Sequence, residues 1–205
     1  MVTTTRFTEV EVDPILAVIL GKKIETIARE MTLVLERTAR SPLFQVKDFC
    51  TAILDNRARI LSQEEGLPQM AYAIVHALEE LKKFFKEDVH SGDLFIHNDP
   101  YSGGNHAPDT CIYSPVFVED KLEFWVAAKG HLADLGGAVM GGYNPTATDI
   151  WQENFRLPPL RICDKGVLRD DVWNLLRANT RIPKLVLGDL EASIGACRTG
   201  GRRLI

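Results

Sequence analysis

The sequence predicts an α+β protein in which mixed helices pack on antiparallel β-hairpins as a single continuous unit. Three observations support this fold class. Apolar residues recur at helical spacing near both ends of the chain, short β-rich segments alternate with turn residues in the middle, and no repeat or low-complexity linker divides the chain. Hydrophobic residues make up 45% and charged residues 25% of the 205 residues, so the chain is expected to bury one sizeable core.

The first half of the chain predicts two helices separated by a hairpin. Asp13-Pro14 is a capping acid followed by a proline at the first helical position, and a long helix is expected from there to Ser41-Pro42. Residues 48–61 contain an apolar segment followed by turn residues, which favours a β-hairpin. Leu67-Pro68 then opens a second helix, which carries apolar residues as far as Phe85.

The second half predicts strands and loops, followed by further helices. Residues 115–128 alternate between apolar and polar side chains around a short turn, so we expect a hairpin whose second strand runs toward His131. Helical spacing returns in the last forty residues. One helix is expected over residues 172–179, another segment begins at Ile182-Pro183, and residues 192–196 form a third apolar segment.

Charge and cysteine content argue against several classes of partner. The chain has 24 Lys and Arg against 28 Asp and Glu, a formal charge of −4, which disfavours nucleic acid and a polybasic membrane surface. Its four cysteines lie far apart and form no C-x-x-C pair, which is typical of reduced thiols. The amino terminus lacks an apolar signal core, and no apolar run is long enough to span a membrane. We therefore expect a cytoplasmic protein.

Two glycine-rich loops carry the strongest candidates for chemistry. His106 and Asp109 follow a pair of glycines in the first loop, and His131 lies at the expected end of a strand before a second pair. Two imidazoles and a carboxylate are suitable ligands for a divalent transition metal that keeps one position open for water or substrate. Asp134 is either a fourth ligand or the acceptor that fixes the tautomer of a ligating histidine. Alternatively, these side chains only tie the two loops together by hydrogen bonds.

A second polar segment extends over residues 144–159. Asp149, Gln152 and Glu153 are spaced, together with Arg156, for a short helix with a polar stripe. This stripe either contacts a substrate or another protein chain, or it is the solvated end of a helix before a pair of prolines. The sequence contains no phosphate-binding G-x-x-x-x-G-K-[ST] loop, no G-x-G-x-x-G spacing and no G-x-S-x-G nucleophile motif. If ATP is used, it is therefore bound elsewhere.

Six short segments, taken in their order along the chain, indicate a protein family. They are His97-Asn98-Asp99-Pro100-Tyr101, Gly104-Asn105-His106-Ala107-Pro108-Asp109, His131-Leu132-Ala133-Asp134-Leu135-Gly136-Gly137, Ala147-Thr148-Asp149-Ile150-Trp151-Gln152-Glu153, Arg156-Leu157-Pro158-Pro159 and Gly200-Gly201-Arg202-Arg203-Leu204. In this order they resemble the hydantoinase B/oxoprolinase family. The resemblance implies that residues 1–205 are the amino-terminal part of a domain of this type, and we expect residues 1–13 to form an arm.

The resemblance also implies cofactors and partners. Members of the family include B subunits of ATP-dependent N-methylhydantoinases, the corresponding half of 5-oxoprolinase, and metal-carrying subunits of acetone and acetophenone carboxylases. By this resemblance, His106, Asp109 and His131 hold a divalent metal, which is zinc, manganese or iron, and ATP is bound by a hydantoinase A-type partner subunit in a hetero-oligomer. We expect Asp134 or Asp99 to act as general base. The residues expected to contact the small-molecule substrate are Asn98, Asp149, Gln152 and Glu153.

The function that these expectations favour is the metal-carrying subunit of an ATP-dependent amidohydrolase of the hydantoinase or 5-oxoprolinase type. In such a complex, ATP activates a carbonyl group in the partner subunit, and a cyclic amide is then hydrolysed at the metal. Two alternatives stay open. One is a subunit of an acetone or acetophenone carboxylase, and the other is a truncated scaffold subunit without catalytic activity.

Overall fold

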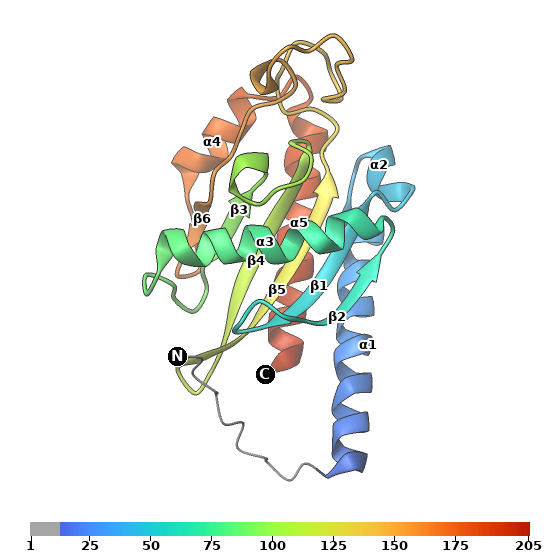
Figure 1. Ribbon diagram of the computed structural model, residues 1–205, viewed down its shortest axis with the longest axis vertical. Helices are drawn as coiled ribbons and strands as arrows, with labels where there is room; N and C mark the ends of the chain where they lie inside the picture. The colour runs from blue at the N-terminus through green and yellow to red at the C-terminus, as the bar shows by residue number, and fades with distance from the viewer. Residues whose placement is uncertain (1–12) are drawn as a thin grey trace, which may run out of the picture.

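The computed structural model describes residues 13–205, which form one seven-stranded antiparallel sheet between two layers of helices (Figure 1). The strand order is β2-β1-β5-β4-β3-β6-β7. The predicted α+β class and the predicted single unit of helices on antiparallel hairpins are confirmed. Of the arm expected at residues 1–13, all but Asp13 lies outside the described residues.

The strands are β1 (Phe49–Asp55), β2 (Ile60–Glu65), β3 (Leu94–His97), β4 (Asp109–Val118), β5 (Lys121–His131), β6 (Leu160–Asp164) and β7 (Val167–Leu168). The α-helices are α1 (Pro14–Thr38), α2 (Pro42–Gln45), α3 (Pro68–Phe85), α4 (Asp170–Ala178) and α5 (Pro183–Leu204). Two 3-10 turns, η1 (Pro100–Ser102) and η2 (Ile150–Gln152), lie in the loops. Within the described residues, no helix is long and apolar enough to cross a membrane.

Local signals in the sequence place the helix starts correctly. The Asp13 carboxylate accepts a hydrogen bond of 2.9 Å from the backbone N–H of Ile15 and so caps α1. The other two long helices also begin at a proline, at Pro68 and Pro183, as the sequence predicts. Proline is favoured there because its fixed φ suits a helix and its missing N–H would have no intrahelical partner.

Two local predictions were wrong. The apolar segment at residues 192–196, expected as a third segment, is the middle of one continuous helix, α5, whose Gly200 packs closely on α1. A Cβ added at Gly200 would lie 2.4 Å from Met31 Sδ of α1. The short helix expected over residues 149–156 is only the single turn η2, in which the Asp149 side chain accepts from the backbone N–H of Gln152.

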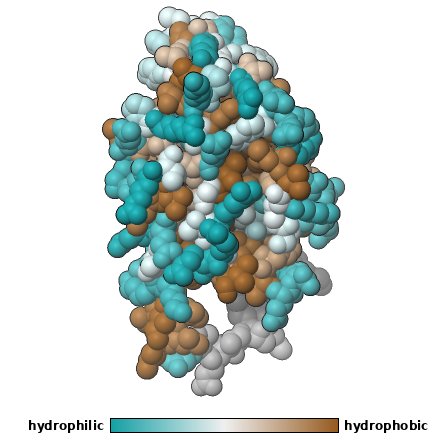
Figure 2. All heavy atoms as spheres, turned by 180° about the vertical axis from the view of Figure 1, so that it is seen from behind, coloured by the Kyte–Doolittle hydropathy of each residue, from teal (hydrophilic) through white to brown (hydrophobic). Residues whose placement is uncertain are grey.

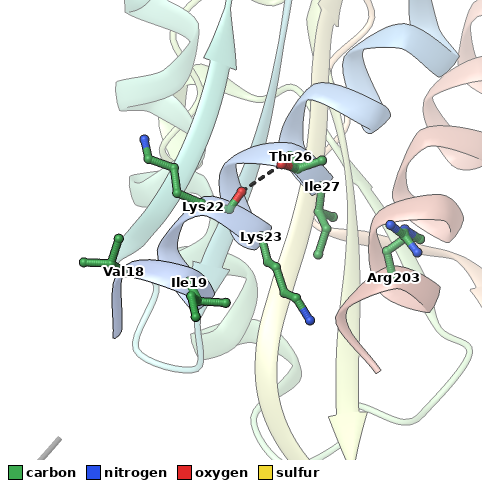
Figure 3. Close-up of a pocket in the computed structure, with 7 residues that line it drawn as sticks. All are labelled: Val18, Ile19, Lys22, Lys23, Thr26, Ile27 and Arg203. Atoms are coloured by element: carbon green, nitrogen blue, oxygen red, sulfur yellow. Dashed lines mark hydrogen bonds between the residues drawn. The ribbon is translucent and has the colours of Figure 1, made fainter. Parts of the chain in front are cut away.

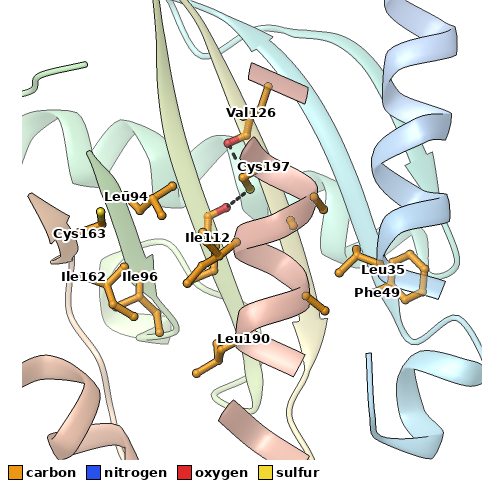
Figure 4. Packing of buried hydrophobic residues seen from close by; sticks show 14 of the residues in the cluster. Leu35, Phe49, Leu94, Ile96, Ile112, Val126, Ile162, Cys163, Leu190 and Cys197 are labelled. Carbon is orange, nitrogen blue, oxygen red and sulfur yellow. Dashed lines mark hydrogen bonds between the residues drawn. The ribbon is translucent and has the colours of Figure 1, made fainter. Parts of the chain in front are cut away.

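The helices cover the sheet unequally (Figure 1). On one face, α1, α4 and α5 bury the larger apolar cluster, where Cys197 Sγ lies 3.5 Å from the backbone oxygen of Ile112 (Figure 4). On the other face, α3 covers a smaller cluster that includes Cys50 and Cys111. All four cysteines are buried in these two clusters, Cys163 and Cys197 in the larger one and Cys50 and Cys111 in the smaller one.

The sheet register sets the position of the candidate site. Asp109 at the start of β4 is paired with His131 at the end of β5, and Phe49 at the start of β1 is paired with Gly130. The adjoining ends of β1, β4 and β5 therefore meet at one edge of the sheet, which is the upper end in Figure 1. Because side chains alternate along a strand, Lys129 and His131 point to the face that α3 covers.

Candidate functional site

The structure brings the three predicted metal ligands together at the ends of β4 and β5. His131 Nδ1 lies 3.1 Å from Asp109 Oδ1, and the ring centroids of His106 and His131 are 5.4 Å apart. The loop before β4 is fixed locally, because the backbone N–H of Asp109 donates to the backbone oxygen of His106 at 2.8 Å. The prediction from the sequence that the two glycine-rich loops are neighbours is therefore confirmed.

Asp109 and His131 shift each other's protonation. Burial alone opposes ionisation of Asp109, but hydrogen bonds from His131 and from Asn105 Nδ2, at 2.7 Å, together with the charge of Lys129, outweigh it and lower the pKa of this carboxyl. Burial likewise opposes protonation of His131, yet the hydrogen bond and charge of Asp109 raise the pKa of the imidazole above its ordinary 6.5. Both shifts favour the ion pair.

Asp48 joins this group and was not found from the sequence. It directly precedes β1, and its backbone oxygen accepts a hydrogen bond of 3.1 Å from the backbone N–H of His131. Its Oδ1 atom is buried and has no hydrogen-bond partner among the described residues. Burial raises the pKa of Asp48, and the nearby Asp109 adds to this effect while His131 and His106 oppose it. An unpaired buried carboxylate oxygen beside two imidazoles is available to a ligand.

The side chains at this site are chemically suitable ligands for a divalent transition metal, but they are not yet arranged around one position. Two imidazoles and the carboxylates of Asp109 and Asp48 are the nitrogen and oxygen donors that zinc, manganese and iron accept. Over residues 13–205, however, no three His, Cys, Asp or Glu side chains are already arranged as a metal cage. The hydrogen bond between His131 and Asp109 is also the loop contact that the alternative interpretation predicts. Metal binding at His106, Asp109 and His131 therefore stays a prediction.

The two aspartates expected as general bases both make strong contacts within the protein. Asp134 is fully buried, and its Oδ1 accepts from Arg181 Nη1 at 2.8 Å while its Oδ2 accepts from the backbone N–H of the same residue. Asp99 forms two hydrogen bonds of 2.9 Å with Arg156. Burial opposes ionisation of Asp99, but the bonds from Arg156 outweigh it and lower its pKa. These contacts favour a role in holding loops, and a role as base stays a prediction.

The residues expected at the substrate lie on one side of these loops. Asn98 is buried, with its Nδ2 donating to the backbone oxygen of Phe155 at 3.1 Å and its Oδ1 accepting from the backbone N–H of Leu157 at 2.6 Å. Gln152 donates to Asp149 Oδ2 at 2.8 Å. The neighbouring hollow, of about 240 Å³, is lined by Gly136, Gly137, Trp151, Asn154, Phe155, Arg156 and Asn179. Contact between substrate and Asn98, Asp149, Gln152 or Glu153 stays a prediction.

A second layer of polar groups lies beneath the site. Lys129 is fully buried on β5, and His97 is fully buried at the end of β3. Burial, with a contribution from the charge of Lys129, lowers the pKa of His97 to about 4, so this imidazole is neutral at pH 7. Its Nε2 lies 2.9 Å from Ser102 Oγ.

An apolar groove of about 460 Å³ lies away from the site, between α1 and the last turn of α5 (Figure 3). Val18, Ile19 and Ile27 line it, with Arg203 at its rim. The neighbouring first turns of α1 carry exposed apolar side chains, which Figure 2 shows as a hydrophobic region at the lower end of the molecule. Helices that are apolar on all sides are usually buried, so this end of α1 has the character of a surface that other polypeptide covers.

The fold and the histidine and aspartate side chains at the sheet edge define a class of α+β domain whose candidate centre is built from strand ends. The chain belongs to the hydantoinase B/oxoprolinase family, whose model matches residues 13–205. This finding confirms the family that the six sequence segments indicate.

Three relatives illustrate the range of the family. The caprolactamase beta subunit of Pseudomonas jessenii is 41% identical over 95% of this chain and 34% of its own length. The crystal structure of the ATP-dependent caprolactamase from that organism has a TM-score of 0.90 at 40% identity and covers 95% of this chain and 34% of the solved chain. A putative D-/L-hydantoinase B subunit of Pseudomonas sp. is 31% identical, covering 95% and 34%. The acetophenone carboxylase delta subunit of Aromatoleum aromaticum is 30% identical, covering 94% and 28%.

The chain spans about a third of the length of these relatives. Their names describe subunits of ATP-dependent or multi-subunit enzymes that act on amides or ketones. Membership of an enzyme family whose relatives assemble from several subunits is thereby established. The substrate, metal and partner of this chain are matters of proposal.

Proposed function

We propose that this chain is the metal-carrying part of an ATP-dependent amidohydrolase complex that hydrolyses a cyclic amide after ATP activates it in a hydantoinase A-type partner subunit. The observation that carries the proposal is the meeting of His106, Asp109 and His131 at the sheet edge of a chain that is 41% identical to a caprolactamase subunit. A lactam is a cyclic amide, so this relative favours an amide over a ketone as substrate.

In this proposal, His106, Asp109 and His131 hold a zinc, manganese or iron ion, and Asp48 contributes its unpaired oxygen as a further donor. When bound, such an ion supplies Lewis-acid activation of a carbonyl group or of water. The chain itself orients the imidazole ring of His131 toward the ion. Asp109 accepts from His131 Nδ1–H, which fixes the imidazole tautomer and leaves Nε2 free to bind.

The loops around the centre supply orientation of the substrate. Asp149, Gln152 and Glu153 lie on or beside η2, close to the hollow that Arg156 and Trp151 line, and these side chains are proposed to contact the substrate with Asn98. The bonds of Asp99 to Arg156 and of Asp134 to Arg181 support their part in holding these loops in place. Either aspartate can act as a base only when its arginine contact opens.

The proposal of an ATP-binding partner rests on a motif that this sequence lacks. The chain has no phosphate-binding loop, and its relatives are described as subunits, which supports binding of ATP by a hydantoinase A-type partner in a hetero-oligomer. The exposed apolar first turns of α1 are consistent with such an assembly. Four buried cysteines, none of which forms a disulfide among the described residues, support the proposal of a reducing, cytoplasmic location.

A ketone carboxylase subunit is the second candidate, because the acetophenone carboxylase delta subunit is 30% identical over 94% of the chain. Reconstitution with a hydantoinase A-type partner separates the candidates. Hydrolysis of ATP that depends on a lactam, hydantoin or 5-oxoproline supports the amidohydrolase, whereas ATP hydrolysis that requires both a ketone and bicarbonate supports the carboxylase. No stimulation by any of these substrates, with no metal in the purified complex, would support the non-catalytic scaffold.

A further inference from the structure

Lys129 is a buried ionisable residue to which the proposed function gives no task. Burial lowers the pKa of its ammonium group, while Cys111 and Asp109 oppose this effect. Lys129 lies on β5, two residues before His131 and on the same face of the sheet. Its side chain is fully buried, and its Nζ atom has no hydrogen-bond partner in the described part of the chain. Lysine is almost never fully buried without a partner, because removing an ammonium group from water is costly. A lysine kept at this position therefore calls for an explanation other than stability.

The neighbours of Lys129 show that its charge acts on Asp109 as well as on His97. In the sheet register it lies directly opposite Cys50 on β1 and Cys111 on β4. Asp109 is two residues from Cys111 on the same strand and is therefore the diagonal neighbour of Lys129, which a long side chain reaches. The surrounding side chains on this face, including Tyr113 and Trp125, are mostly apolar and buried. In such surroundings the charge of Lys129 is weakly screened from the Asp109 carboxylate.

Among the described residues, Asp109 has no positive charge beside it other than Lys129 when His131 is neutral, as an imidazole that binds a metal must be. Its carboxylate is buried, and its hydrogen-bond donors are Asn105, which is neutral, and His131, which is positively charged only when protonated. Asn105 lies in the loop before β4, His131 is the register partner of Asp109 at the end of β5, and Lys129 lies two residues earlier on that strand. A buried carboxylate that faces only neutral donors is costly to keep in place, and a buried cation next to it reduces that cost.

We propose that Lys129 is a positioning residue whose buried positive charge holds the Asp109 carboxylate directed at His131, so that the imidazole presents Nε2 to a divalent ion. The part that concerns the ion rests on the proposed function, whereas the effect on the His131 ring does not. Lys129 acts through Asp109 and does not touch the substrate. A purely structural role would make the opposite prediction for stability, since it requires the lysine to strengthen the fold.

Lys129→Met tests the proposal, because methionine has a similar length and needs no partner. Lys121→Met is the matched control, since Lys121 is exposed on the same strand. We would measure the urea unfolding midpoint, the affinity for Zn²⁺ and Mn²⁺ by calorimetry, and the ¹⁵N chemical shifts of the His131 ring in the metal-free protein. We expect Lys129→Met to leave the midpoint unchanged or higher, to weaken metal binding about 10- to 100-fold and to alter the His131 tautomer signals. Lys121→Met should match the original protein in all three measurements.

Different results separate this proposal from the proposed function. If the unaltered protein binds neither ion, the proposed metal function fails, and the His131 signals alone decide the role of Lys129. Unchanged His131 signals in Lys129→Met would overturn the positioning role, as would a large loss of stability with normal metal affinity. If the methionine variant does not fold, Lys129→Arg and Lys129→Gln replace it. Original His131 signals in the arginine variant and altered signals in the glutamine variant support the proposal, and equal signals in both overturn it.

Discussion

His131 and Asp109 are register partners on β5 and β4, and His131 Nδ1 lies 3.1 Å from Asp109 Oδ1. The pair joins the two glycine-rich loops, which also carry His106 and Asp134. Its position at the ends of two long strands makes it rigid, because the ladder between these strands runs from Asp109 to Val118. A site built on strand ends is held more accurately than one built on loops alone.

Asp109→Asn should lower the pKa of His131, because the variant keeps the shape of the side chain but loses the charge that raises this pKa. The same change should weaken divalent metal binding by at least about 10- to 100-fold, because it alters a proposed ligand and also removes the charged partner of His131. An NMR titration of the His131 ring measures the first effect. Asp120→Asn, in the exposed turn between β4 and β5, is the control. An unchanged His131 titration would contradict the pairing.

His97 should make the protein sensitive to acid. Its folded pKa of about 4 is below the ordinary value of 6.5, so the unfolded chain binds the proton more readily. The contribution of His97 to stability is therefore complete above pH 6.5 and is lost as the pH falls toward 4. The shift corresponds to roughly 3 kcal/mol at most. Urea unfolding at several pH values measures this contribution when the original protein is compared with His97→Gln. His131, whose pKa is shifted in the opposite direction, is present in both proteins and cancels in the comparison. Parallel pH profiles would refute the assignment.

Asp134→Asn distinguishes a structural from a catalytic aspartate. The buried carboxylate accepts from both the side chain and the backbone of Arg181, so removing its charge should cost about 1–3 kcal/mol of unfolding free energy. Urea unfolding measures this loss, and activity in the reconstituted complex should fall only in proportion to the folded fraction. Full stability with abolished activity would instead identify Asp134 as the general base.

Gly200→Ala tests the close contact between α1 and α5. A Cβ at this position would lie 2.4 Å from Met31 Sδ, and forcing an extra methyl group into a packed interface typically costs about 1–3 kcal/mol. Gly195→Ala on the same helix is the matched control, because its nearest neighbour is Val34 Cγ1 at 3.7 Å. The control should be neutral or stabilised by up to about 1 kcal/mol, since alanine favours helix over glycine. Equal effects in the two variants would show that α1 and α5 pack less closely at Gly200.

Local patterns predicted much of this fold, because they depend on neighbouring residues. Asp13-Pro14 marks the start of α1, and the alternation over residues 115–128 marks the hairpin of β4 and β5. The pairing of β1 with β5 joins residues that are distant in the chain, such as Phe49 and Gly130, and no local pattern encodes it. Residues 192–196 were expected as a separate apolar segment, although they lie within one continuous helix whose Gly200 packs on α1.

In the candidate site, too, the residues found from the sequence have local signals, and the residues that were missed depend on contacts between distant segments. His106, Asp109 and His131 were found from the sequence because glycine-rich loops flank them beside strands. Asp48 was missed, since only the β1–β5 register brings it next to His131. Its one local signal is an acid directly before an apolar strand, which also fits an ordinary turn. The partners of Asp99 and Asp134, which are Arg156 and Arg181, are likewise 57 and 47 residues away in the sequence.

Metal content of the purified protein tests the central claim most directly. Elemental analysis after dialysis against zinc, manganese and iron would compare the original chain with His106→Ala and with His76→Ala, a control at an exposed histidine on α3. We predict stoichiometric metal in the original chain and the control, and loss of metal in His106→Ala with an unchanged circular dichroism spectrum. Equal metal content in all three proteins, or none in any, would contradict a metal centre at His106, Asp109 and His131.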